Sequence, residues 1–293
     1  MRGELAALMA AGLWAIATVM FGRLGKALPP LVLNLAKGAI ALTLLILTLA
    51  LLGQSTAGLD RRAIGVLALS GVIGIGLGDT AYFAAINRLG PRRALLLETL
   101  APPLAALMAL AFLQEALSPR AWMGIGLTLA GVVWVIAERL PEGSAAGRLD
   151  YRGVGYGLLA ALGQATGAVM SRAMLADTAV SPLWSSLLRL SGGCIILLGI
   201  LRYRGPVVGA LRPLRSPRLL AGVALAAVLG TYLAIYLQQI ALKYAATGIA
   251  QALTSTSPLF VLPLAAALGD RVSLRAVAGA VVALLGIAIL VNG

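Results

Sequence analysis

The sequence contains no histidine and a single cysteine, and only 5% of its 293 residues are aromatic. Histidine is the usual general base near neutral pH and a common ligand of zinc and haem, so sites of those kinds lack their main residue. A lone cysteine excludes a disulfide within the chain. We therefore expect no cofactor, no metal site and no catalytic residues, and we interpret Cys194 as a small packing residue in an apolar stretch.

Charged residues are also scarce. They make up 11% of the chain and hydrophobic residues 60%, whereas soluble proteins carry about 25% charged residues. Acids are the rarer sign, with 10 Asp and Glu against 23 Lys and Arg and a net charge of +13. The bases lie almost entirely in short connections between apolar stretches, a pattern typical of membrane proteins rather than nucleic-acid binders. We therefore expect a lipid bilayer and a small-molecule substrate as partners, and no nucleic acid.

The apolar residues form stretches of about 20, long enough to cross about 30 Å of hydrocarbon as helices. The sequence predicts an all-α membrane protein with ten transmembrane helices. We interpret the first stretch as a permanent helix rather than a cleaved signal peptide, because it continues to full span length. The ten predicted spans are residues 4–22, 31–52, 64–86, 92–113, 120–138, 153–174, 180–201, 218–241, 246–268 and 273–292.

The second half of the sequence resembles the first at one fixed offset of 155 residues. The aligned pairs are Thr99 and Thr254, Pro103 and Pro258, Glu115 and Asp270, Gly124 and Gly279, and Gly131 and Gly286. A repeat with an odd number of spans enters the membrane upside down in its second copy, and two inverted copies enclose a site near the midplane. We therefore divide the chain into a first five-helix repeat (1–138), a linker (139–152) and a second, inverted five-helix repeat (153–293) around a central cavity.

Ten spans bring both termini to one face of the membrane, which we call the terminal face. Its bases are Arg2, Arg61, Arg62, Arg120, Arg172 and Lys243. The opposite face, which we call the arginine-rich face, holds fifteen bases, among them Arg88, Arg152, Arg202, Arg212 and Arg215. The positive-inside rule then places the arginine-rich face in the cytoplasm and both termini outside.

Two blocks carry a resemblance to a known family. Leu113–Ser118 reads LQEALS and Leu268–Ser273 reads LGDRVS, and each follows an alanine-rich stretch with a central proline and precedes two glycines. In these features the chain resembles the EamA-type branch of the drug/metabolite transporter (DMT) superfamily over nearly its whole length. The resemblance implies ten helices in two inverted repeats, a cavity lined mainly by spans 1, 3, 4, 6, 8 and 9, and alternating access.

The resemblance also implies a multi-pass protein of a bacterial-type inner (cytoplasmic) membrane. Members of the family are often described with cytoplasmic termini, which is opposite to the orientation that the charge count favours. Both orientations therefore stay open at this point.

Four charged residues lie well inside the predicted spans, away from their ends. Asp79 and Glu98 lie at similar depth, and an intramembrane carboxylate, which costs about 2.5–3.5 kcal/mol to insert, usually faces a cavity or a partner. The two acids could carry a proton or bind an ammonium group. Alternatively, each lies near a helix end or pairs with a base such as Lys37. Lys37 and Arg189 occupy equivalent places in the two halves, which suits either a structural role or the binding of a substrate carboxylate.

Prolines mark the fourth span of each half. Pro102, Pro103, Pro258 and Pro263 fall inside spans 4 and 9. Proline removes a backbone donor and leaves a carbonyl unpaired one turn earlier, which lipid tolerates only against protein or a water-filled cavity. We expect both helices to kink beside the cavity and to act as hinges. A kink used only for packing is the alternative.

The candidate cavity residues are charged, aromatic, amide and hydroxyl side chains well inside the spans. They are Trp14, Thr18, Asp79, Tyr82, Glu98, Gln164, Thr166, Arg189, Tyr232, Tyr236, Gln251, Thr254 and Ser257. Two glycine pairs at a spacing of seven, Gly124 with Gly131 and Gly279 with Gly286, would let helices approach closely. These glycines form either a seam within one chain or a dimer face, so the oligomeric state is open between monomer and dimer.

The family resembled here includes exporters of amino acids, other metabolites and drugs, so the substrate is left open. A cavity with acids, bases and aromatic rings suits zwitterions, and the leading hypothesis is secondary export of small metabolites, amino acids first. The alternative within the family is a multidrug exporter of cationic compounds. An intramembrane enzyme would need a nucleophile–base or metal constellation that the chain lacks. A channel is disfavoured because the inverted repeat and mid-span prolines indicate moving gates.

Overall fold

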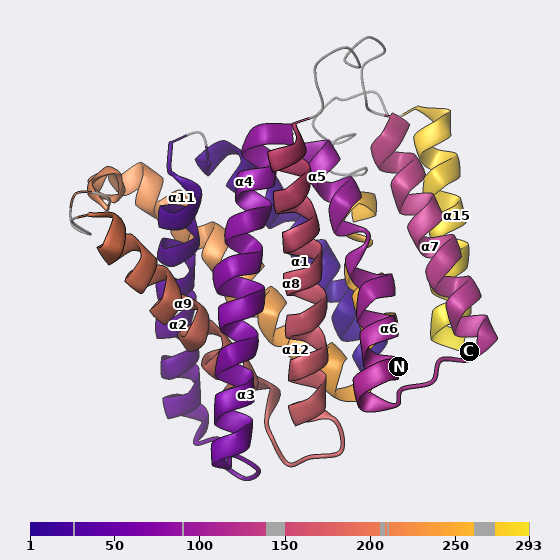
Figure 1. Ribbon diagram of the computed structural model, residues 1–293, viewed down its shortest axis with the longest axis horizontal. Coiled ribbons are helices and arrows are strands. Elements are labelled where there is room, and N and C mark those ends of the chain that lie inside the picture. Colours follow the sequence, from indigo (N-terminus) through magenta and orange to yellow (C-terminus); the bar gives the residue numbers. More distant parts are fainter. Residues whose placement is uncertain are drawn as a thin grey trace.

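The computed structural model describes residues 1–25, 27–89, 91–138, 150–205, 209, 211–260 and 273–292, and every regular element among them is helical (Figure 1). The expectation of an all-α protein is confirmed. In the described part, eight helical stretches are long and apolar enough to cross a membrane by length and composition, and a shorter apolar helix covers Pro119–Val135. The predicted span 246–268 is described only as far as residue 260.

In the described part of the chain, five helices besides α7 (Pro119–Glu138) run through without interruption. They are α1 (Arg2–Leu24), α2 (Pro30–Leu52), α8 (Tyr151–Leu175), α9 (Pro182–Arg204) and α15 (Leu274–Asn292). Local chemistry explains where two of them begin. The Ser181 hydroxyl accepts from Leu183 N before α9, and the Asp150 carboxylate accepts from Arg152 N and Gly153 N before α8. Such caps satisfy the backbone donors that a helix leaves free at its start.

The third helix of each half widens into a π-helical segment. In the first half, α3 (Arg61–Gly71) continues as η1 (Val72–Asp79) and then α4 (Thr80–Leu89). In the second, α11 (Pro217–Ala227) continues as η4 (Val228–Leu233) and α12 (Ala234–Tyr244), after the short 3₁₀ helix η3 (Arg212–Arg215). Such segments are rare, and they often mark functional sites.

The fourth helix of each half is broken. In the first half, α5 (Pro91–Glu98) ends at a turn formed by Thr99 and Leu100, and α6 (Ala101–Leu113) follows. In the second half, α13 (Thr247–Thr254) ends at a turn at residues 255–256, and one further helical turn covers 257–260.

The prolines stand just after these breaks. Pro102 lies in the first turn of α6, where a missing N–H costs least, and Pro258 lies in the helical turn after the second break. The structure therefore has short interruptions where we expected continuous, kinked helices. Pro263 lies outside the described residues.

Helix α7 (Pro119–Glu138) packs along α15 at one edge of the molecule (Figure 1). A Cβ added at Gly131 would overlap Ala283 N and lie 2.5 Å from Gly279 O, and one added at Gly286 would overlap the Thr128 backbone. Gly124 lies against Leu290 of the same contact. The glycine stripes therefore lie in a contact between two helices of one chain.

Candidate functional site

A cavity of about 160 Å³ lies among α1, α2, α4, α5, α8, α9, α12 and α13. One water molecule needs about 10–15 Å³, so this space can hold a small solute. The lining includes ten of the thirteen residues expected from the sequence. These are Trp14, Thr18, Asp79, Tyr82, Glu98, Gln164, Arg189, Gln251, Thr254 and Ser257.

The other three expected residues lie outside this lining. Thr166 donates to Leu162 O of its own helix, at 2.8 Å. The Tyr232 hydroxyl lies 2.7 Å from Thr48 Oγ1 of α2, and Tyr236 packs with Tyr232 against the apolar cluster of α2 and α9. Because Tyr232 and Tyr236 are four residues apart, they lie on the same face of their helix, and this face packs against neighbouring helices.

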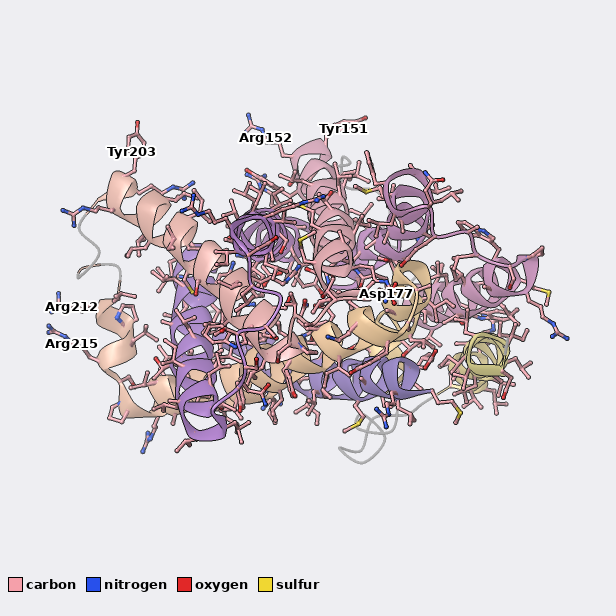
Figure 2. The ribbon with its side chains drawn as sticks, turned by 90° about the horizontal axis from the view of Figure 1, so that it is seen from below. Tyr151, Arg152, Asp177, Tyr203, Arg212 and Arg215 are labelled. Carbon is pink, nitrogen blue, oxygen red and sulfur yellow. The ribbon has the colours of Figure 1, made fainter. Side chains whose placement is uncertain are left out.

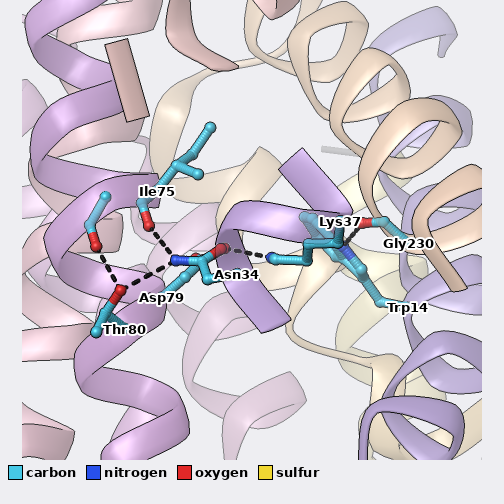
Figure 3. Close-up of polar contacts among 8 residues, drawn as sticks. Trp14, Asn34, Lys37, Ile75, Asp79, Thr80 and Gly230 are labelled. Carbon is cyan, nitrogen blue, oxygen red and sulfur yellow. Dashed lines mark hydrogen bonds and ion pairs between the residues drawn. The ribbon is translucent and has the colours of Figure 1, made fainter. Parts of the chain in front are cut away.

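Lys37 is paired inside the cavity wall. Its Nζ lies 2.6 Å from Asp79 Oδ2 (Figure 3), and the Lys37 side chain is only 7% exposed. The rings of Phe21 and Phe83 flank the ammonium group, with centroids 5.5 Å and 5.2 Å from Nζ. An opposite charge and two aromatic faces both stabilise a desolvated cation. The charge of Lys37 is therefore already balanced by the protein.

Asn34, one turn before Lys37 on α2, fixes the π segment that carries Asp79. Its Nδ2 donates to Ile75 O at 2.9 Å and to Thr80 Oγ1 at 3.1 Å (Figure 3). Trp14 does the same for the other π segment, since its Nε1 donates to Gly230 O at 2.8 Å. Each π segment thus has a carbonyl held by a side chain of another helix. An amide inside a span was the available signal for Asn34, and our candidate set did not include it.

Glu98 ends α5 at the helix break. Among the described residues no base lies within ion-pair distance of its carboxylate. Its neighbours are the Tyr82 hydroxyl, with which it shares a hydrogen bond, and the charged groups of Asp79 and Lys37. Within the described part of the chain, Glu98 is therefore the cavity carboxylate that has no cation at ion-pair distance.

Arg189 is almost completely buried, at 2% exposure. Its Nη1 donates to Ser70 Oγ at 3.1 Å and also to Gly167 O and Ser171 Oγ. These acceptors are neutral oxygens of α3 and α8, and the structure gives Arg189 no carboxylate partner within its described residues. Its Nε atom is buried without an acceptor. Arg189 therefore anchors α9 to α3 and α8, and no carboxylate of the described residues lies at ion-pair distance from it.

Comparison with protein families decides the class of this molecule. The profile of the EamA-like transporter family matches residues 1–137 and 151–292. The chain belongs to the EamA-like transporter family. A search of curated proteins gives no match. Among solved structures, one titled only "Crystal structure of protein" is similar with a TM-score of 0.77 and 19% identity, over 99% of this chain and 97% of that chain. At this identity the likeness shows the fold alone.

As a member of this family, the EamA-like transporter belongs to the DMT superfamily. Proteins of this family are membrane transporters and not enzymes. The resemblance drawn from the LQEALS and LGDRVS blocks is thereby confirmed at the level of the family. The apolar helices fit a multi-pass membrane protein.

The lining of the EamA-like transporter also contains residues that the sequence did not single out. Phe21 and Phe83 are two of them. Gln238, an amide well inside the predicted span 218–241, also lines the cavity, with its Nε2 3.4 Å from Gln251 Oε1. Phe21 continues the face of Trp14 and Thr18 at helical spacing, so the face of α1 could have identified it. Phe83 follows Tyr82 directly, and only the packing against Lys37 shows that both rings reach the cavity region.

Proposed function

We propose that this EamA-like transporter is a secondary transporter that exports small zwitterionic metabolites, most of all amino acids, by alternating access. We place it in a bacterial-type inner membrane. The observation that carries the substrate class is the pattern of charges in the cavity. Lys37 and Asp79 neutralise each other, whereas Glu98 and Arg189 are opposite charges that have no ion-pair partner among the residues that the structure describes.

An uncompensated acid and an uncompensated base in one cavity suit a solute that carries both charges. We assign the substrate ammonium group to Glu98 and the substrate carboxylate to Arg189, whose Nε has no acceptor. The side chain would lie against the rings of Trp14 and Tyr82. Partners of opposite charge lower the cost of keeping each group in a low-dielectric site.

The architecture that we propose is two inverted five-helix repeats, residues 1–138 and 153–293, joined by 139–152. Matching irregularities support it, since both halves carry a π segment in the third helix and a break in the fourth. At each break a threonine donates to the carbonyl three residues earlier, Thr99 to Leu96 O and Thr254 to Gln251 O. These threonines are the pair related by the offset of 155.

Counterflow in proteoliposomes tests the substrate class. A panel of labelled amino acids identifies the best substrate, which then competes with its own decarboxylated amine and deaminated acid. For leucine these are 3-methylbutylamine and 4-methylpentanoate. We expect each analogue to compete at least about tenfold more weakly than the amino acid, because each loses one charged hydrogen-bond partner.

Variants test which residue binds the ammonium group of the substrate and which binds its carboxylate. Glu98→Gln should remove competition by the amine and keep competition by the acid, and Arg189→Lys should weaken competition by the acid. Thr166→Ala is the matched control, because Thr166 is on α8 but outside the lining, and its transport should equal that of the parent. Equal flux in protein-containing and empty vesicles across the whole panel would refute the proposal.

A second candidate is export of cationic drugs. The rings of Trp14, Phe21, Tyr82 and Phe83 near the carboxylates of Asp79 and Glu98 favour it, because aromatic faces and acids both attract cations. In that case cationic dyes would compete with one another, and amino acids would not displace them. Arg189→Lys would then leave the flux unchanged.

A further inference from the structure

A second polar cluster lies at the terminal face, outside the cavity. Glu115 stands in the connection after α6, and Arg172 lies in the last turn of α8. Arg172 Nε donates to Glu115 Oε1 at 2.5 Å, and both side chains are only 16% exposed.

The pair joins four parts of the chain. Arg172 Nη1 donates to Leu242 O at 2.9 Å and to Lys243 O at 2.8 Å, at the end of α12. Glu115 Oε2 accepts from both Thr247 N and Thr247 Oγ1 at 2.9 Å, at the start of α13. A carboxylate at a helix start and a guanidinium at a helix end both match the helix dipole. The cluster therefore ties the connection after α6 and the end of α8 to the ends of α12 and α13.

This cluster lies just beyond the floor of the cavity. Gln238 of α12 and Gln251 of α13 line the cavity, and Leu242 and Thr247 are one helical turn, about 6 Å, nearer the terminal face. At this level α13 packs closely on α6. A Cβ added at Gly248 would lie 2.6 Å from Ala106 Cβ.

We propose that Glu115 and Arg172 are gating residues, which seal the cavity from the terminal face and separate in each transport cycle. This inference rests on the proposed alternating access. A charged pair suits a seam that must open repeatedly, because water solvates both partners when they separate. An apolar seam of the same size would expose hydrophobic surface at every opening.

The test measures access to the cavity and needs no substrate. The background variant is Cys194→Ala, which removes the only cysteine. Gln238→Cys then reports from the cavity floor through its rate of labelling by a membrane-impermeant maleimide. Ser55→Cys and Ser216→Cys, both at exposed positions, identify vesicles with the terminal face or the arginine-rich face outward.

With the terminal face outward, we expect slow labelling of the Gln238→Cys reporter in the background protein. Adding Glu115→Gln should raise the rate about tenfold or more, since one charged hydrogen-bond partner of the closed state is lost. Glu115→Asp, which keeps the charge on a shorter side chain, should give an intermediate rate. Labelling from the arginine-rich face should not rise.

The matched control is the ion pair at the opposite face. Arg88 Nη1 lies 3.1 Å from Asp150 Oδ2, and this hydrogen bond lowers the pKa of the exposed Asp150 carboxyl. Asp150→Asn breaks a pair of the same kind and should leave terminal-face labelling at the background rate.

An unchanged labelling rate in folded Glu115→Gln protein would overturn the proposal. An equal rise in labelling from both faces would also overturn it, because it would show that the whole helix packing has loosened. If Glu115→Gln does not fold, Glu115→Asp and Arg172→Lys carry the test by the same criterion. If Glu115→Gln speeds labelling but the protein transports no amino acid, the gating role of Glu115 and Arg172 is supported and only the proposed substrate is refuted.

Discussion

At the scale of single residues, Lys37 and Asp79 form an ion pair in the wall of the cavity. Two charges removed from water are tolerated because each neutralises the other at 2.6 Å. Removing one partner leaves the other charge uncompensated in a poor solvent, which is far more costly than removing both.

We expect Lys37→Met to lower the free energy of unfolding by about 3 kcal/mol, the low end for breaking a buried pair, because Asp79 is partly exposed. The double variant Lys37→Met/Asp79→Asn should recover most of that loss. Denaturant unfolding in detergent, arranged as a double-mutant cycle, measures both values. Strictly additive losses would show that the pair does not stabilise the fold.

The charged residues of the cavity could be identified from the sequence, because a charged side chain inside a membrane span costs free energy. Asp79, Glu98 and Arg189 stand in apolar stretches, and such groups face a cavity or a partner. The same reasoning did not show that Tyr232 and Tyr236 lie outside the lining. A tyrosine ring can be placed at many positions of a membrane helix at little cost in free energy, and periodicity does not show which neighbour a helix face meets. That Lys37 pairs with Asp79 while Glu98 has no base follows only from the three-dimensional contacts.

At the scale of secondary-structure elements, the contact between α7 and α15 depends on residues without a side chain. We expect Gly131→Ala to destabilise the protein by about 1–3 kcal/mol, because its Cβ would overlap Ala283 N and the two helices would have to separate. Gly126→Ala on the same helix meets no atom within 4 Å and should be neutral or slightly stabilising. Thermal unfolding in detergent distinguishes the two, and equal effects would contradict close packing at Gly131.

The positions of the helices could be predicted from stretch length, but their interruptions could not. Proline indicated irregularity in the fourth helix of each half, and the structure places a turn two to three residues before Pro102 and Pro258. The π segments carry no proline. Their carbonyls are held by Asn34 and Trp14 from other helices, so these irregularities depend on tertiary contacts that a periodicity analysis does not contain.

At the scale of the whole molecule, the uneven charge of the two faces predicts an orientation. Six bases against fifteen favour a cytoplasmic position for the arginine-rich face, whereas the family resemblance favours cytoplasmic termini. Exposed Arg152, Arg212 and Arg215 of the arginine-rich face project from the molecule in Figure 2. We expect an impermeant maleimide added to intact cells to label Ser55→Cys and to leave Ser216→Cys unlabelled until the cells are lysed. The opposite pattern would place both termini in the cytoplasm.

The contacts of α1 have a consequence for how the protein is made. Helix α1 packs on α12 and α13, and α7 packs mainly on α15, so two helices of the first half find their main partners near the end of synthesis. By contrast, Lys37 meets Asp79 as soon as the first three spans have entered the bilayer. The nascent chain can therefore neutralise this pair early, while α1 and α7 remain exposed to lipid or to the insertion machinery until the last third of the polypeptide arrives.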